Sequence, residues 1–163
     1  MAEGEFALMQ QHLEAALEID LAPGATRTGG EDAYAMLADA AAEQRDQAML
    51  RKYAPPAEET ATRIGHKLFM GIAYRAWGVA HTLAGEFPQA EARLQQALEL
   101  FSSYPVPWQI GRTLFDMGEL ARAERKTELA RDYFTRALSA FEEMGAAPYA
   151  VRTRAALESL SAG

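Results

Sequence analysis

The feature that most constrains the fold of this chain is a pattern that recurs after 40 residues, because residues 71–101 return as residues 111–141. The repeated positions are Gly71, Gly78, Ala90, Ala97, Leu98 and Phe101, which return as Gly111, Gly118, Ala130, Ala137, Leu138 and Phe141. A fixed period carried by small and apolar residues is typical of helical repeat arrays, in which each unit buries its apolar side against the next. The recurrence therefore predicts an all-α chain built from antiparallel helix-turn-helix units.

The apolar spacing within each period predicts two amphipathic helices, and the same reading extends over the whole chain. We treat residues 1–163 as one domain, with a half repeat at 5–21, a loop at 22–30, repeats at about 31–64, 66–103 and 107–144, and a capping helix at 147–161. The half repeat resembles a second helix whose first helix is missing. We interpret this as a piece of a longer protein or as an unusual N-terminal cap.

Residues 47–64 form the least regular part of the array, because Pro55-Pro56 falls inside a predicted helix. A proline within a helix removes a hydrogen-bond donor and clashes with the preceding turn. We expect either a kink there, or a short helix that ends at Tyr53 and a new helix that starts at Pro55 or Pro56.

The charge balance argues against nucleic acid and anionic membrane as partners. The chain has 16 Lys and Arg against 23 Asp and Glu, a net charge of −7, and its basic residues are interleaved with acidic ones. Binding to a phosphate backbone needs clustered basic residues instead. The chain has no cysteine, no apolar run long enough to span a membrane and no signal-peptide pattern at its start. We predict a soluble cytoplasmic protein.

The repeated residues resemble the tetratricopeptide repeat family. When Gly78 is taken as the family's eighth-position glycine, small, aromatic and leucine positions of the family are matched by Gly85, Phe87, Ala90, Ala97 and Leu98. The next unit departs from the family at Arg125, where a turn glycine is expected. The period of 40 resembles the long-helix branch of the family, and the resemblance implies a right-handed superhelix.

A closer resemblance concerns the two runs at 97–122 and 137–160. They are similar to the C-terminal repeats of large bacterial signal-transduction ATPases and LuxR-type transcription regulators. This resemblance implies that the chain is a sensor or scaffold segment. The phosphate-binding motif GxxxxGK[ST] of such ATPases does not occur in the sequence.

In the tetratricopeptide family, first helices line a concave groove at fixed positions. Carried over to this sequence, those positions are Ile72, Arg75, Val79, Thr82, Arg112, Phe115, Glu119 and Arg122. An apolar floor with arginines predicts a groove for an extended or helical peptide that bears carboxylates. The alternative is a solvated face that serves only for stacking.

The half repeat also predicts self-association, because its apolar stripe has no first helix to cover it. The stripe consists of Phe6, Met9, Leu13 and Leu17. Exposed apolar stripes drive association. We expect a homodimer or an exchanged N-terminal helix.

The sequence predicts a non-catalytic module that binds protein or peptide, with another domain of a parent protein as one candidate partner. No nucleophile, base and orienting group converge, so we predict no enzyme activity and no cofactor. The histidines His12, His66 and His81 lack the neighbours of a metal-binding face, so no metal is predicted. The alternatives that stay open are a receptor for a small molecule or a signalling peptide, and a self-association module.

Overall fold

The computed structural model describes residues 3–20 and 30–161, with side chains at 8–18 and 32–161. The described residues form eight helices and no strand. The helices are α1 (Glu3–Asp20), α2 (Gly30–Gln44), α3 (Gln47–Ile64), α4 (Lys67–Ala84), α5 (Phe87–Ser103), α6 (Pro107–Ala123), α7 (Thr127–Glu143) and α8 (Ala147–Ser161). The predicted all-α helical repeat fold is confirmed, and the handedness of the superhelix stays a prediction. The predicted loop at 22–30 falls, apart from Gly30, outside the described residues.

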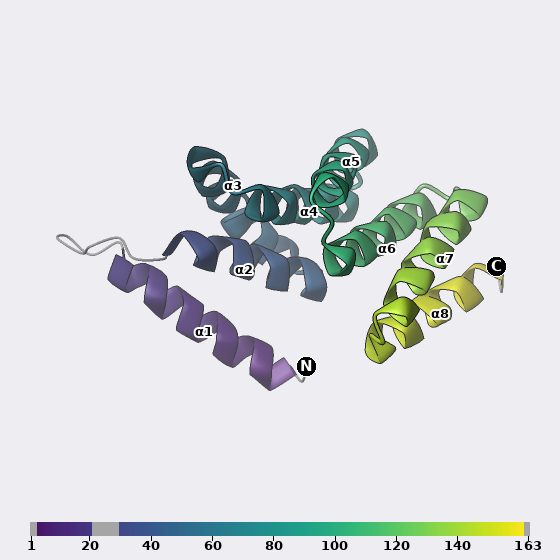
Figure 1. The fold of residues 1–163 in the computed structure, drawn as a ribbon, viewed down its shortest axis with the longest axis horizontal. Coiled ribbons are helices and arrows are strands. Elements are labelled where there is room, and N and C mark those ends of the chain that lie inside the picture. The colour runs from purple at the N-terminus through teal and green to yellow at the C-terminus, as the bar shows by residue number, and fades with distance from the viewer. Residues whose placement is uncertain (1–2, 21–29, 162–163) are drawn as a thin grey trace.

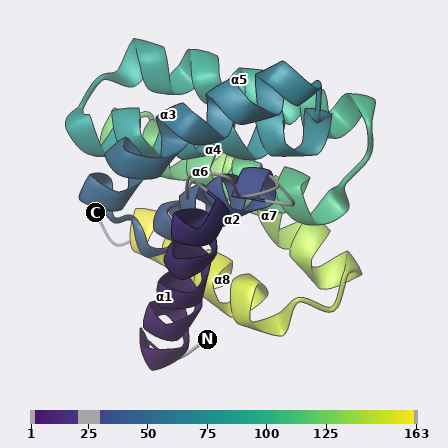
Figure 2. The ribbon, with the colours of Figure 1, turned by 90° about the vertical axis from the view of Figure 1, so that its left-hand side faces the viewer.

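The helices stack in pairs along a curved array (Figure 1). The first helices α2, α4 and α6 lie side by side, and each packs against the second helix that follows it. Both views place α1 and α8 on the side opposite α3 and α5 (Figures 1 and 2). We call the side on which α2, α4, α6 and α8 carry the ion pairs that join them the concave face.

The recurring small residues hold the two layers of helices close together. Gly71 of α4 lies under the ring of Phe101, and Gly111 of α6 lies under the ring of Phe141, so that a β-carbon at either glycine would fall within 3 Å of the ring. Both phenylalanines are fully buried. The period of 40 residues is therefore a packing period, in which a glycine on a first helix receives a large side chain from its partner helix.

Of the two outcomes predicted for Pro55-Pro56, a helix break at Tyr53 is wrong. Helix α3 runs through both prolines to Ile64. The carbonyl groups that lose their donors belong to Arg51 and Lys52, which are exposed, so water can replace the missing hydrogen bonds. Tyr53, Ala54 and Ala57 on the opposite side are buried and keep the helix on the array.

The turn between α6 and α7 is built by Arg125 in the position where the family has glycine. Its φ of 61° lies in the left-handed region that Gly85 occupies in the equivalent turn between α4 and α5. An L-residue with a β-carbon is disfavoured there by about 1–2 kcal/mol. The side chain of Arg125 is exposed, so nothing in its surroundings requires arginine.

We expect Arg125→Gly to raise the free energy of unfolding by about 1 kcal/mol, because glycine adopts this conformation without strain. Denaturant unfolding followed by circular dichroism measures the change. Arg45→Gly is the matched control: Arg45 has a φ of 53°, but its guanidinium pairs with Asp116 and Glu119. Arg45→Gly should gain less stability than Arg125→Gly, or lose stability. A loss of stability in Arg125→Gly would show that the left-handed conformation of Arg125 is not strained.

Candidate functional site

The centre of the concave face is occupied by paired charges rather than by free arginines. Arg75 of α4 lies between two carboxylates, with Nη2 2.7 Å from Asp39 Oδ1 of α2 and Nη1 3.2 Å from Asp116 Oδ2 of α6. Only 2% of the Arg75 side chain is exposed. Arg75 therefore joins three successive first helices through its two terminal nitrogens.

Arg112 of α6 is held in the same way by α2. Its Nη1 lies 2.7 Å from Asp39 Oδ2, and its Nη2 lies 3.1 Å from Glu43 Oε2. Glu43 also accepts a hydrogen bond from Arg152 of α8 at 2.7 Å. The carboxylates of α2 thus reach α4, α6 and α8. We call Asp39, Glu43, Arg75, Arg112, Asp116 and Arg152 the charge network.

The two aspartates of the charge network respond differently to burial. Burial disfavours ionisation of Asp39, but Arg75 and Arg112 outweigh it and lower the pKa of Asp39. Asp116 is more deeply buried, and its arginine partners, Arg75 and Arg45, lie at 3.2 and 3.7 Å. Burial therefore prevails there and raises the pKa of Asp116. Asp39 is the more firmly ionised of the two.

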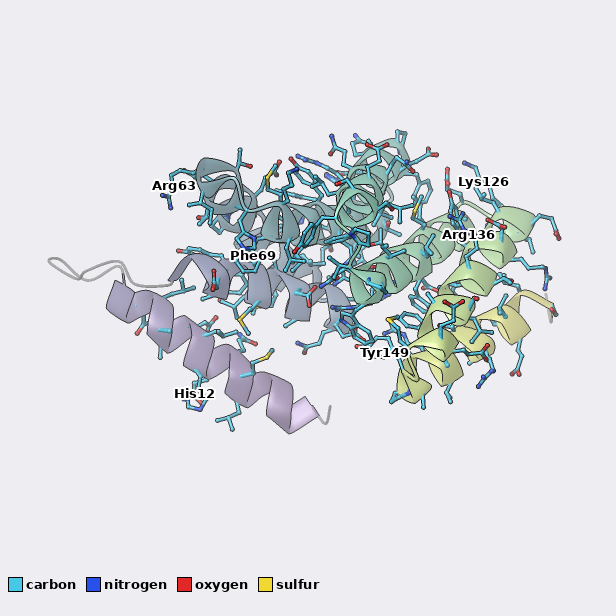
Figure 3. All side chains as sticks on the ribbon, viewed as in Figure 1. His12, Arg63, Phe69, Lys126, Arg136 and Tyr149 are labelled. Atoms are coloured by element: carbon cyan, nitrogen blue, oxygen red, sulfur yellow. The ribbon has the colours of Figure 1, made fainter. Side chains whose placement is uncertain are left out.

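A pocket of about 230 Å³ opens beside the charge network on the concave face. Its lining comes from four helices: Met9 of α1, Met36, Asp39, Ala40 and Glu43 of α2, Trp108 and Arg112 of α6, and Tyr149 of α8. Figure 3 labels Tyr149 at the start of α8, on the side toward α2 and α6. We call this the concave pocket. It combines methionine and aromatic walls with two carboxylates.

Trp108 and Tyr149 form the aromatic wall of the concave pocket, and neighbouring side chains hold Trp108 in place. The ring of Trp108 meets Tyr149 edge-on, with centroids 4.6 Å apart, and lies 6.0 Å from the ring of Phe141. The guanidinium of Arg112 lies 5.7 Å from the centroid of Trp108. Trp108 is half-buried, so part of its ring remains available to a ligand.

The structure places most of the predicted groove residues inside the protein. Ile72, Arg75, Val79, Arg112 and Phe115 are buried. Thr82 is half-buried and donates to the carbonyl of Gly78 in its own helix. Glu119 is half-buried and pairs with Arg45 and with the exposed Arg122. A binding role for these residues stays a prediction, but Arg75 and Arg112 already have carboxylate partners within the chain.

The residues predicted for self-association lie on α1, which packs across α2 and α3. Leu17 is buried in the cluster formed by α2, α3 and α4, and Leu13 packs against that cluster. Met9 lines the concave pocket. The side chain of Phe6 lies outside the described residues. Self-association stays a prediction, and much of the stripe that suggested it is covered by the chain's own helices.

Sequence reasoning missed Asp39, Glu43, Asp116 and Tyr149. One signal was present for Asp39: it stands 40 residues before Val79 and 80 before Glu119, which are both predicted groove positions. Applying those positions to the first unit would have found it. Asp116 and Tyr149 lie outside the groove positions, and only the curvature of the array brings Tyr149 toward α2.

Neither a metal site nor a membrane-spanning helix is found among residues 3–20 and 30–161. Within 3–20 and 30–161, no three His, Asp or Glu side chains are grouped so that they could hold a metal ion. Among the helices described here, none combines the length and the apolar character needed to cross a membrane.

Residues 69–143 match the family model described as tetratricopeptide repeat. The match extends from the third residue of α4 to the last residue of α7, so it supports the predicted resemblance over two helical pairs. A search of the curated proteins gave no match. Repeats of this family generally mediate protein–protein interactions and are typically non-catalytic scaffolds.

Proposed function

We propose that the chain is a non-catalytic module that binds a peptide or protein segment on its concave face, with one side chain of the partner inserted into the concave pocket. The observation that carries this proposal is the pocket itself, which four helices line together. Tetratricopeptide repeats present extended concave surfaces to their partners, and the matched stretch includes α4 and α6 of this face.

The size of the concave pocket favours a side chain over a free ligand. Small-molecule sites usually enclose about 300–1,000 Å³. At about 230 Å³ the concave pocket is smaller than that range. A peptide that lies along the face and places one side chain in the pocket would gain contact area outside it as well.

We further propose that this module is the scaffold or sensor part of a larger bacterial regulator that works in the cytoplasm. The support is the resemblance of the runs 97–122 and 137–160 to the C-terminal repeats of such regulators. A partner domain from the same parent protein is then the first candidate for the concave face.

Filling the pocket tests the binding proposal. Ala40 lines the concave pocket, so we expect Ala40→Phe to occupy the space and to lower partner recovery at least about tenfold. The readout is recovery of partners from a lysate of the source organism on the immobilised chain. Ala155→Phe, at an exposed position of α8, is the matched control and should recover them normally. A partner bound equally by both variants would place binding elsewhere on the chain.

A further inference from the structure

The charged groups of the concave pocket are arranged so that carboxylate faces the solvent and guanidinium lies behind it. The side chains of Asp39 and Glu43 are 24% and 20% exposed. Those of Arg75 and Arg112, which pair with them, are only 2% and 6% exposed. The side chains of Asp39 and Glu43 are therefore more accessible to a ligand than the guanidinium groups of Arg75 and Arg112, although the network as a whole contains both signs of charge.

The arginines of the charge network offer little to an acidic ligand. Both terminal nitrogens of Arg75 and of Arg112 already donate to carboxylates, and their remaining Nε atoms are buried. Arg152 is the most exposed arginine of the network, at 39%, but it pairs with Glu43 and lies over the ring of Phe115, outside the lining of the concave pocket. An acidic side chain in the pocket would meet Asp39 and Glu43 without a free cation.

The walls of the pocket are chemically matched to the stem of a long cationic side chain. Met36 is 47% exposed and Met9 is half-buried, so their flexible side chains can enclose a chain of methylene groups. Trp108 supplies an aromatic ring, on which a cation is stabilised by the π electrons. The apolar wall and the acidic oxygens therefore lie in one pocket, as an apolar stem with a positive end requires.

We propose that the concave pocket selects a lysine or arginine side chain of the bound peptide, whose methylene stem packs on Met9, Met36 and Trp108 while its cationic end meets Asp39 and Glu43. This inference rests on the proposed function and names the chemistry of the partner. It reverses the charge that the sequence predicts for the ligand. The chain's net charge of −7 also attracts a basic partner at long range.

Titration with short peptides tests the selectivity directly. Trp77→Phe leaves Trp108 as the sole tryptophan, so its fluorescence reports on the pocket. The probes are three end-capped pentapeptides, Ala-Ala-X-Ala-Ala, in which X is lysine, norleucine or glutamate. Norleucine keeps an unbranched methylene stem without the charge. We expect the lysine peptide to bind about tenfold more tightly than the norleucine peptide, with a preference that shrinks as salt is added, and the glutamate peptide to bind least.

A pair of variants at Met36 locates the binding in the pocket. Met36→Arg places a cation of the chain's own beside Asp39 and Glu43 and should weaken binding of the lysine peptide about tenfold, because it competes for the same oxygens. Met36→Leu keeps an apolar wall and should leave that affinity nearly unchanged. Equal weakening by both variants would show that the methionine itself, and not charge, decides binding.

The outcomes separate the two proposals. Equal affinity for the lysine and norleucine peptides would overturn the charge selectivity and leave peptide binding at the pocket standing. Tightest binding of the glutamate peptide would also overturn it. No response of Trp108 to any of the three peptides at millimolar concentration would overturn both the selectivity and the pocket as a peptide site. Butylamine binding as tightly as the lysine peptide would assign the pocket to a free amine.

Discussion

Arg75→Met is expected to lower the free energy of unfolding by about 3–5 kcal/mol, because it leaves a buried carboxylate without its main partner. Asp116 is 8% exposed, and after the substitution its nearest remaining cation is Arg45 at 3.7 Å. Asp39 keeps Arg112 at 2.7 Å, so the loss falls mainly on Asp116. Denaturant unfolding followed by circular dichroism measures the difference between the variant and the parent chain.

Two further variants show whether the unpaired charge is the cause. Arg75→Met/Asp116→Leu removes the charge together with its partner and should recover most of the loss, because a buried ion pair can be replaced by apolar side chains at little cost. Arg136→Met is the matched control at an exposed pair with Asp132, where both side chains are more than half exposed, and should change stability by less than about 0.5 kcal/mol. A loss below about 1 kcal/mol for Arg75→Met would mean that water reaches Asp116.

Gly118→Ala is expected to lower the free energy of unfolding by about 1–3 kcal/mol, although alanine favours helix formation more than glycine does. A β-carbon at Gly118 would lie 2.6 Å from two ring atoms of Phe134. That ring is fully buried, so it has no free space into which it can move. Gly118→Val adds a larger side chain and should lower the free energy of unfolding further. Denaturant unfolding followed by circular dichroism measures both variants.

The equivalent position of the first unit provides the control for Gly118. Ala38 stands there, and the position equivalent to Phe134 is Ala54; both alanines are buried. Ala38→Gly should therefore destabilise the protein by about 1 kcal/mol, the opposite preference to that at Gly118. Combining Gly118→Ala with Phe134→Leu should cost less than the sum of the two single changes. Additive costs would show that the two side chains do not compete for space.

The helices were predictable because periodicity and turn residues are local signals. Gly65 and Gly85 end α3 and α4 in the left-handed conformation, and each is visible in the sequence as a punctuating glycine. The predicted helix break at Tyr53 is wrong, because the local sequence does not show which side of the helix is exposed to water. A helix can continue through prolines when the carbonyl groups that lose their donors face water. Which side of α3 faces water depends on how the helix packs in the array.

The concave face was predictable in position but not in chemistry. The repeat register assigns Arg75 and Arg112 to first helices, and in the structure they lie on α4 and α6 and both pair with Asp39 of α2. Their partners are 36 to 73 residues away in the chain. Whether an arginine on such a face is free or paired depends on how tightly the array curves. Asp39 and Asp116 pair with the arginines of this face, and the carboxylates that line the concave pocket belong to Asp39 and Glu43.

The contact between Glu43 and Arg152 has a mechanical consequence. A stack whose units touch only their neighbours bends easily, because each interface opens by a small amount and the openings add along its length. Here Asp39–Arg112 and Glu43–Arg152 join α2 to α6 and α8, which are not its neighbours in the stack. Straightening the array would have to stretch both of these charge-assisted hydrogen bonds at the same time. These two contacts therefore oppose straightening of the array.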